Sequence, residues 1–428
     1  MFQYIRSHAF VRDVSVLAIG TAIAQVFSFL LYPLIGRLYT PEEMAAFAVF
    51  TSIFTVCQSI STGKYETSIF LAKRDADAAN IVVLVASLCI IFNLFLYLII
   101  ILFGDTINGL MKVSLGKLLY LVPVSILSLT LFDTYNEWCI RKKYFSKLSI
   151  NKISNSILVN GGKVGVAYTP FHSIGLVLGD VLGRFASAIT CVVRIFISDR
   201  NDFKNVTISG MKEQARAFDR FPKFQMPSQF LNTLGASVPV LLLTFFYKGS
   251  EVGQFSMAIA VMSVPIGVIA RAIRDVSRKK IKDSLGIESN IHYIFLSLLK
   301  KSLFLSIIVG LSLVYFLPFA FSFVLGNQWE QAGLFAQLLT PMFIASFVST
   351  CVESPIIVAM KLKQAFFWQL LYSICNILPI VVGSILGLKI EMTLLLYALS
   401  MVICFTILII IAERCAKYLD QHGSDYIQ

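Results

Sequence analysis

The sequence predicts an all-α polytopic membrane protein with about twelve transmembrane helices. Apolar residues make up 57% of the 428 residues and charged residues only 14%, far from the balance of a soluble domain. Apolar stretches of the roughly 20 residues that a helix needs to cross the hydrocarbon core recur along the whole chain. The alternating segments of about ten residues that mark a membrane β-barrel do not occur in it, so helices are the expected spanning elements.

The expected spans follow one another with mostly short connections. The first has no small-residue cleavage site, so we expect it to remain as a helix and not to be removed as a signal peptide. The fifth is the least apolar, and Pro239 is expected to break the seventh. We place the spans at residues 13–35, 44–62, 80–103, 117–137, 150–169, 174–197, 226–247, 254–270, 302–325, 333–358, 365–387 and 392–411.

The distribution of Lys and Arg predicts the orientation. An even number of spans places both termini on one side, and most of the 36 Lys and Arg residues fall on that side, including those of residues 198–225 and 271–301. The positive-inside rule therefore places both termini in the cytoplasm. The net charge of +12 reflects this bias, so nucleic acid is not an expected partner. The opposite side receives Arg37, Lys112, Lys117, Lys248 and Lys389.

The motifs of several enzyme classes are missing from the sequence. No P-loop is present, the four histidines form no cluster, and the expected outer loops are too short for an extracytoplasmic catalytic segment. None of the eight cysteines falls in an outer loop and no C-x-x-C occurs, so neither disulfides nor metal sites are expected. These observations leave a carrier or a membrane scaffold, and not an enzyme.

The two halves of the chain share a short pattern that indicates an internal repeat. In each half, an apolar span precedes a tyrosine, and a second apolar span follows a phenylalanine, with a glutamate between them. A proline early in a later span, Pro123 or Pro341, adds a second correspondence. Internal repeats are a common plan for secondary transporters. The matched residues are Tyr39, Glu43 and Phe47 in the first half and Tyr247, Glu251 and Phe255 in the second.

Polar side chains form stripes along three of the expected spans. Within the bilayer such faces point at other helices or at a water-filled cavity. Hydrogen bonding between helices is one interpretation, which Ser and Thr often provide, and a cavity lining is the other, which Gln and Asn favour. The stripes are Thr21, Gln25, Ser28 and Tyr32; Thr51, Thr55, Gln58 and Thr62; and Gln225, Gln229 and Asn232.

Charges within the spans are a sharper signal. Lys163 lies in the middle of the fifth span, directly after Gly161-Gly162, where we expect the helix to loosen. An unpaired ammonium at this depth costs about 2.5–3.5 kcal/mol on insertion scales, so we expect it to meet an anion, which we interpret as an anionic substrate. Lys152 is closer to the cytoplasmic end and can snorkel. Asp180 and Arg184 are four residues apart on the sixth span, so we expect them to neutralise each other.

Further charges lie at the cytoplasmic ends of the spans. Lys64 and Arg271 end spans that correspond under the repeat, so each half presents a cation suited to phosphate oxygens, with Arg274 beside the second. Anchoring to anionic lipid headgroups is the alternative for residues 278–280. The candidates for carrying a coupling ion are Asp133, Glu137, Glu353 and Asp180, although Asp180 is also the expected partner of Arg184.

Two groups of residues resemble the signature of a known family. These are the O-antigen and other polysaccharide flippases, the Wzx-type branch of the multidrug/oligosaccharidyl-lipid/polysaccharide (MOP) exporter superfamily. The pattern differs at Ala45, where a glycine is expected, and at Arg274, where an uncharged polar residue is expected. The matching residues are Gly36-Arg37-Leu38-Tyr39-Thr40-Pro41-Glu42-Glu43, Gly63-Lys64-Tyr65-Glu66, Arg220-Phe221-Pro222-Lys223-Phe224, Pro227, Asn232, Pro239, Gly253, Phe255 and Pro265.

The resemblance implies a MATE-like fold and a lipid-linked cargo. Two pseudo-symmetric six-helix bundles, residues 1–200 and 226–428, would be joined by a cytoplasmic linker, residues 201–225, around a cavity that opens alternately to each side. The implied cargo is an oligosaccharide on undecaprenyl diphosphate, moved from the inner to the outer leaflet of the bacterial inner membrane. The expected partners are this cargo, membrane lipids, a polysaccharide polymerase and a chain-length regulator.

The candidate site residues fit such a cargo. Lys64, Lys163, Arg271 and Arg274 are expected to bind the diphosphate and acidic sugars, and Gln25, Gln58, Gln229 and Asn232 to bind sugar hydroxyls. No cofactor is expected, and coupling to a proton or sodium gradient is what the superfamily implies.

Three other functions stay open. A MATE-type multidrug or cation antiporter would need acidic residues deep in the cavity, whereas the mid-span charge here is Lys163. A lipid II flippase often has two further helices. A scaffold of the polysaccharide assembly machinery is the third alternative, and it would need no polar stripes.

Overall fold

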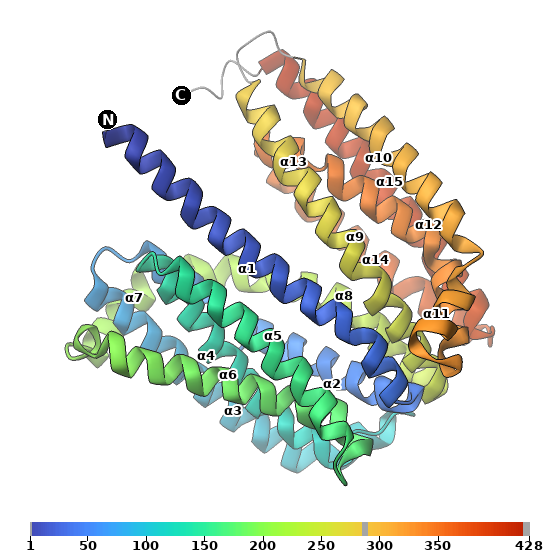
Figure 1. Cartoon of the computed structure of the whole chain (residues 1–428), viewed down its shortest axis with the longest axis horizontal. Coiled ribbons are helices and arrows are strands. Elements are labelled where there is room, and N and C mark those ends of the chain that lie inside the picture. Colours follow the sequence, from blue (N-terminus) through green and yellow to red (C-terminus); the bar gives the residue numbers. More distant parts are fainter. Residues whose placement is uncertain (1, 285–289, 423–428) are drawn as a thin grey trace. The chain divides into compact units, whose positions relative to one another are not determined.

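The computed structural model describes residues 2–284 and 290–422 and places helices along nearly all of them (Figure 1). No β-strand occurs in these two ranges, which confirms the predicted fold class. The helices divide into two compact units, Met1–Thr233 and Leu234–Gln428.

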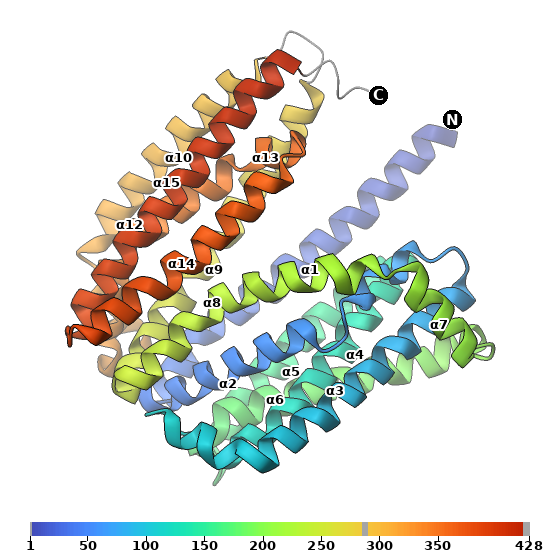
Figure 2. The same ribbon diagram turned by 180° about the vertical axis from the view of Figure 1, so that it is seen from behind.

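The first unit contains long helices joined by short turns and 3₁₀ segments (Figures 1 and 2). Its helices are α1 (Phe2–Leu38), α2 (Pro41–Ile60), α3 (Asp75–Leu110), α4 (Val122–Arg141), α5 (Phe145–Ala167), α6 (Gly175–Ser198), the short α7 (Ile208–Ala217) and the start of α8 (Met226–Phe246).

The second unit begins within α8 and carries the remaining helices (Figure 1). These are α9 (Gly249–Asp283), α10 (Ile291–Val314), α11 (Leu317–Leu325), α12 (Glu330–Val352), α13 (Ser354–Val358), α14 (Leu362–Ile385) and α15 (Ile390–His422).

Eleven helical segments of the described residues are long and apolar enough to cross a membrane. The fifth expected span corresponds to α5, a helix of 23 residues whose lysines and asparagines make it less apolar than the others. Two expected spans differ from the structure. Residues 302–325 are divided at Tyr315–Phe316, because Pro318 lies at the start of α11, and residues 333–358 are divided at Glu353, because Pro355 lies at the start of α13. Pro239, expected to break its span, lies inside the continuous helix α8.

The repeated tyrosine and glutamate encode the same turn in both units. Before α2, the Thr40 hydroxyl accepts a hydrogen bond from the Glu43 N–H, and the Glu43 carboxylate accepts one from the Thr40 N–H at 2.8 Å. Before α9, the Glu251 carboxylate accepts one from the Lys248 N–H at 2.9 Å. The reciprocal pair at α2 and the single hydrogen bond at α9 satisfy amide groups that a helix start leaves unpaired.

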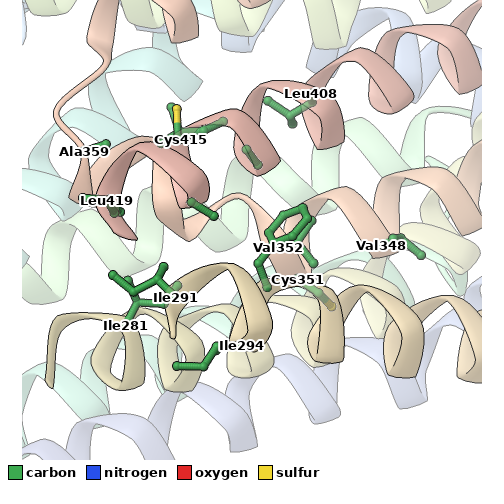
Figure 3. Close-up of a cluster of buried hydrophobic side chains, with 14 of the residues drawn as sticks. Ile281, Ile291, Ile294, Val348, Cys351, Val352, Ala359, Leu408, Cys415 and Leu419 are labelled. Carbon is green, nitrogen blue, oxygen red and sulfur yellow. The ribbon is translucent and has the colours of Figure 1, made fainter. Parts of the chain in front are cut away.

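A cluster of small and branched apolar side chains forms one core of the second unit (Figure 3). It joins α9, α10, α12, α13 and α15 near Ile281, Ile294 and Leu419. The Asp420 carboxylate of α15 accepts hydrogen bonds from the N–H groups of Ile291 and His292, at 2.7 and 2.9 Å. The end of α15 therefore caps the start of α10.

In the first unit a second core surrounds Trp138 and Tyr135, between α3 and α4. Its polar edge is an ion-pair cluster in which Asp75 contacts Arg141 at 3.0 Å and Lys142 at 2.5 Å. Burial alone would lower the pKa of Lys142, but hydrogen bonds to Asp75 and Asp202 raise that pKa above its ordinary value. The Lys142 ammonium therefore ties the start of α3 to the segment after α6.

Candidate functional site

The candidate site of the first unit is built on a close contact between α5 and α6. Glycines recur every fourth residue along α6, at Gly175, Gly179 and Gly183. A Cβ on Gly179 would lie 2.5 Å from the backbone nitrogen of Lys163, and one on Gly183 would lie 2.4 Å from the Cα of Val159. Small residues at this spacing let two membrane helices approach at backbone distance. Gly162 belongs to this contact within a continuous α5, so the expected loosening of the helix is wrong.

This contact brings one buried carboxylate between two cations. Lys163 Nζ lies 3.0 Å from Asp180 Oδ1, and Arg184 Nε lies 2.5 Å from Asp180 Oδ2. The Asp180 side chain is 1% exposed, that of Lys163 11% and that of Arg184 20%. The expected pair between Asp180 and Arg184 therefore forms, but Lys163 shares it. The triad carries a net charge of one positive unit in a region of low dielectric.

Aromatic rings of α2 cover both cations. Lys163 Nζ lies 4.5 Å from the centroid of the Phe47 ring, and Arg184 Cζ lies 5.0 Å from that of Phe54. A ring face attracts a cation and offers it no proton acceptor, so these contacts stabilise the positive charge without neutralising it. Sequence reasoning singled out Phe47 only as part of the repeat, although Phe47 and Phe54 are spaced seven residues apart on one face of α2.

A second charged cluster follows the end of α2. Lys64 Nζ lies 3.2 Å from Glu66 Oε1, and the Thr62 hydroxyl donates to Glu66 Oε2 at 2.6 Å. On α4, the half-buried Asp133 interacts electrostatically with Lys64, Glu66, Arg184 and Glu137. Asp133 and Glu137 are therefore within electrostatic range of the pair formed by Lys64 and Glu66. Glu66 was missing from the candidate residues, although it belongs to the Gly63–Glu66 motif.

The polar stripe of α1 forms hydrogen bonds with α5. The Ser28 hydroxyl lies 2.8 Å from that of Ser156 and accepts a hydrogen bond from Asn160 Nδ2 at 3.0 Å. The Thr21 hydroxyl accepts one from Lys152 Nζ at 3.2 Å. Packing between helices is therefore the role observed for these two residues of the stripe. The Gln25 side chain is half-buried on the same helix.

The polar stripe of α2 forms hydrogen bonds within its own helix. The hydroxyls of Thr51 and Thr55 donate to carbonyl oxygens of their own helix, at 2.9 and 2.8 Å. The half-buried Gln58 lies on the same face.

The remaining candidates lie on α8 and in the second unit. On the first turns of α8, Gln229 and Asn232 are exposed, and Gln229 donates to the Thr233 hydroxyl at 3.3 Å. On α9, Arg274 Nη1 lies 2.9 Å from Glu353 Oε1, so this arginine is paired, whereas Arg271 is exposed. Lys64 belongs to the first unit and both arginines to the second.

The second unit contains a partly open cavity that the sequence did not indicate. It has a volume of about 270 Å³ and lies among α8, α9, α12, α14 and α15. Its polar wall is a hydrogen-bonded chain in which the Tyr397 hydroxyl donates to Asn376 Oδ1 at 3.0 Å, and Asn376 Nδ2 donates to the Tyr372 carbonyl at 2.7 Å. Phe343 and Phe405 contribute apolar surface. The available signal was the pair of polar residues Tyr372 and Asn376, four apart in an apolar span.

Solved structures share this arrangement of helices. The structure titled lipid II flippase MurJ, inward closed conformation, matches with a TM-score of 0.72 and 14% identity, over 95% of this chain and 90% of that one. An inward-facing multidrug resistance MATE family transporter of the MOP superfamily matches with a TM-score of 0.63 and 14% identity, over 96% of this chain and 100% of that one. A MOP superfamily transporter from Pyrococcus furiosus matches with a TM-score of 0.54 and 14% identity, over 96% of both chains. The chain is thus a multi-pass membrane protein with the fold of the MOP superfamily.

The sequence itself matches a family profile described as polysaccharide biosynthesis protein, over residues 34–333. This match covers most of the chain, so the chain belongs to that family of polysaccharide biosynthesis proteins. No curated protein matches the sequence.

Proposed function

We propose that this protein is a flippase that moves an oligosaccharide linked to undecaprenyl diphosphate, such as an O-antigen repeat unit, from the inner to the outer leaflet of the bacterial inner membrane. The observation that carries the proposal is the triad of Lys163, Asp180 and Arg184, which places two cations beside one carboxylate where α5 and α6 pack together. Membership of the polysaccharide biosynthesis family supports a glycan as cargo.

The net charge of the triad supports an anionic ligand. Each cation already shares Asp180, so the triad is stable when empty, and its surplus positive charge attracts an anion. The guanidinium of Arg184 can bind two phosphate oxygens at once, and the ammonium of Lys163 adds a point charge. A diphosphate can thus exchange with Asp180 as the partner of these cations and leave again. Lys64, Arg271 and Arg274 are further proposed ligands of the anionic groups of the cargo.

Polar groups of both units are proposed to bind the sugars. Gln25, Gln58, Gln229 and Asn232 carry amide groups that donate to and accept from hydroxyls. The cavity lined by Tyr372, Asn376 and Tyr397 adds aromatic faces and a polar wall. Its volume of about 270 Å³ is just below the roughly 300–1,000 Å³ of drug-sized sites, so it suits a group as small as one sugar ring.

Alternating access driven by a proton or sodium gradient is the proposed mechanism. Asp133 and Glu137, together with Asp180, are the proposed ion-coupling residues, because carboxylates linked to cations can exchange a proton or Na⁺ as those cations change partners. A polysaccharide polymerase and a chain-length regulator, which use the cargo after translocation, are the proposed partners.

Gene deletion with complementation tests this function. We expect the deletion strain to lose its surface polysaccharide and to accumulate lipid-linked repeat units in the inner leaflet. Wild type and Lys212→Met, which removes an exposed charge from α7, should restore the surface polymer, whereas Lys163→Met should not, at equal protein level. Unchanged surface polysaccharide in the deletion strain would overturn the proposal. Altered dye efflux would indicate a drug exporter, and lysis would indicate a peptidoglycan precursor as cargo.

A further inference from the structure

A groove lies between the end of α9 and the start of α10 in the second unit. Its volume is about 510 Å³, and its lining is mostly apolar. The two helices contribute matching stripes, in which five residues follow the spacing of one helical face. The lining residues are Ala272, Ile273, Val276, Ser277 and Lys280 of α9, and Tyr293, Ile294, Ser297, Leu298 and Lys301 of α10.

The floor of the groove is part of the core, while its walls are uncovered. Ile294 belongs to the buried cluster of this unit and is 8% exposed (Figure 3). On the walls, by contrast, Val276 and Tyr293 are 72% and 71% exposed. Apolar surface that continues from a core into the open marks a binding surface more often than an ordinary solvated face.

The level of the groove relative to the bilayer follows from the sequence. On α9 the uninterrupted apolar sequence ends at Ala270, whereas the apolar sequence of α10 begins at Ile291 and is interrupted by Lys300 and Lys301. We place the groove at the headgroup layer because these charges and those that follow Ala270 lie along it. Lys301 lies at its membrane-facing end and Lys280 at the opposite end, and the groove extends over eight residues of each helix, or about 12 Å. Both ammonium groups are on flexible stems that can turn toward a charge between them.

We infer that this groove binds an anionic phospholipid of the leaflet that faces the termini. Lys280 and Lys301 bind the headgroup phosphate, and the glycerol and first acyl carbons lie against Ile273, Val276 and Leu298. No acidic side chain is among the lining residues, so the groove complements a negative charge. Basic pockets between membrane helices on the cytoplasmic side bind anionic headgroups in this way. The inference concerns a lipid that is not the cargo, so it stands independently of the proposed transport activity.

Native mass spectrometry of the full-length protein, purified from nanodiscs of phosphatidylcholine and phosphatidylglycerol, tests the site. We expect the wild type to retain one phosphatidylglycerol and the variant Lys280→Gln/Lys301→Gln to lose it. With about 1 kcal/mol for each lysine, the affinity should fall roughly 30-fold. The matched control Lys279→Gln/Lys300→Gln removes the same charge from exposed neighbours outside the groove and should retain the lipid.

A second variant tests the apolar part of the groove. Ser297→Trp fills the space without changing the charge, so we expect it to lose the lipid as well. Equal retention of phosphatidylglycerol by wild type and Lys280→Gln/Lys301→Gln would overturn the inference. Retention of phosphatidylcholine by the wild type to the same extent as phosphatidylglycerol would also overturn it. If inorganic phosphate displaces the lipid at equal concentration, or if Ser297→Trp retains phosphatidylglycerol, the site binds phosphate alone. Either result would contradict the inference.

Discussion

The hydroxyl of Tyr39 donates a hydrogen bond to the backbone carbonyl of Lys163 at 2.6 Å. In the second unit the hydroxyl of Tyr247 lies 3.2 Å from the carbonyl oxygen of Leu388 and 2.6 Å from the Thr393 hydroxyl. Each tyrosine directly precedes a capped helix start, so the repeated sequence pattern ties the same turn to a later part of its own unit. The repeated residues therefore form the same structural connection in each unit.

Tyr39→Phe should lower stability without unfolding the protein. The change removes one buried hydrogen bond and leaves the ring in place, so we expect a loss of about 1 kcal/mol. Thermal unfolding of the detergent-solubilised protein, followed by fluorescence, measures it as a lower midpoint. Tyr168→Phe, at a ring that is 74% exposed, is the control and should leave the midpoint unchanged. Equal midpoints for both variants would contradict a structural role for the Tyr39 hydroxyl.

Gly179→Ala should disrupt the contact between α5 and α6. The added Cβ would lie 2.5 Å from the Lys163 backbone nitrogen, and a helix backbone cannot yield as a side chain can, so we expect a cost of about 1–3 kcal/mol. Gly165→Ala is the matched control, because no atom lies within 4 Å of its added Cβ. Alanine there should stabilise α5 by roughly 0.5–1 kcal/mol. Unfolding midpoints that rank these two variants in the opposite order would exclude the close approach.

Asp180→Asn should destabilise the protein more than Lys163→Met. Asparagine leaves two buried cations without their carboxylate, and breaking a buried pair in this way costs about 3–5 kcal/mol. Lys163→Met instead leaves Asp180 paired with Arg184. The yield of monodisperse protein and its unfolding midpoint measure the difference. The double variant Lys163→Met/Asp180→Asn should recover part of the lost stability. If it is less stable than Asp180→Asn alone, Lys163 does not share the Asp180 carboxylate.

Cysteine labelling should show that the loop after α3 and helix α7 lie on opposite faces of the membrane. A membrane-impermeant maleimide applied to intact cells should label Lys112→Cys, whereas Lys212→Cys should react only after permeabilisation, because the positive-inside rule predicts that α7 is cytoplasmic. Both positions are exposed, and the native cysteines of the described residues are buried apart from the half-buried Cys57, so background labelling should be low. Labelling of Lys212→Cys in intact cells would reverse the proposed orientation.

Much of the fold was predictable because the bilayer imposes long apolar helices. The pair of Asp180 and Arg184 followed from their spacing on one helix. Thr40-Pro41-Glu42-Glu43, in contrast, was noted only for its resemblance to a family motif and not as the capped start of α2. The divisions between α10 and α11 and between α12 and α13 were missed because hydropathy continues across them. Pro318 and Pro355 are the residues that mark these divisions.

The candidate site was less predictable because its contacts join separate helices. Lys163 was recognisable from its depth, but its pairing with Asp180 depends on the glycine contact, which no spacing within α5 reveals. The role of Glu66 depends likewise on a turn that brings its carboxylate back to Thr62 and Lys64. The cavity beside Tyr397 combines five helices, so no single stretch of sequence indicates it.

The ion pair between Lys163 and Asp180 also affects how the nascent chain enters the bilayer. The unpaired ammonium of α5 would make it less favourable for that helix to leave the translocon alone. Its counter-ion is on the next helix to be synthesised, only a short turn later. Membrane integration of α5 is therefore favoured when α5 and α6 partition into lipid together, as a helical hairpin whose charges are already matched.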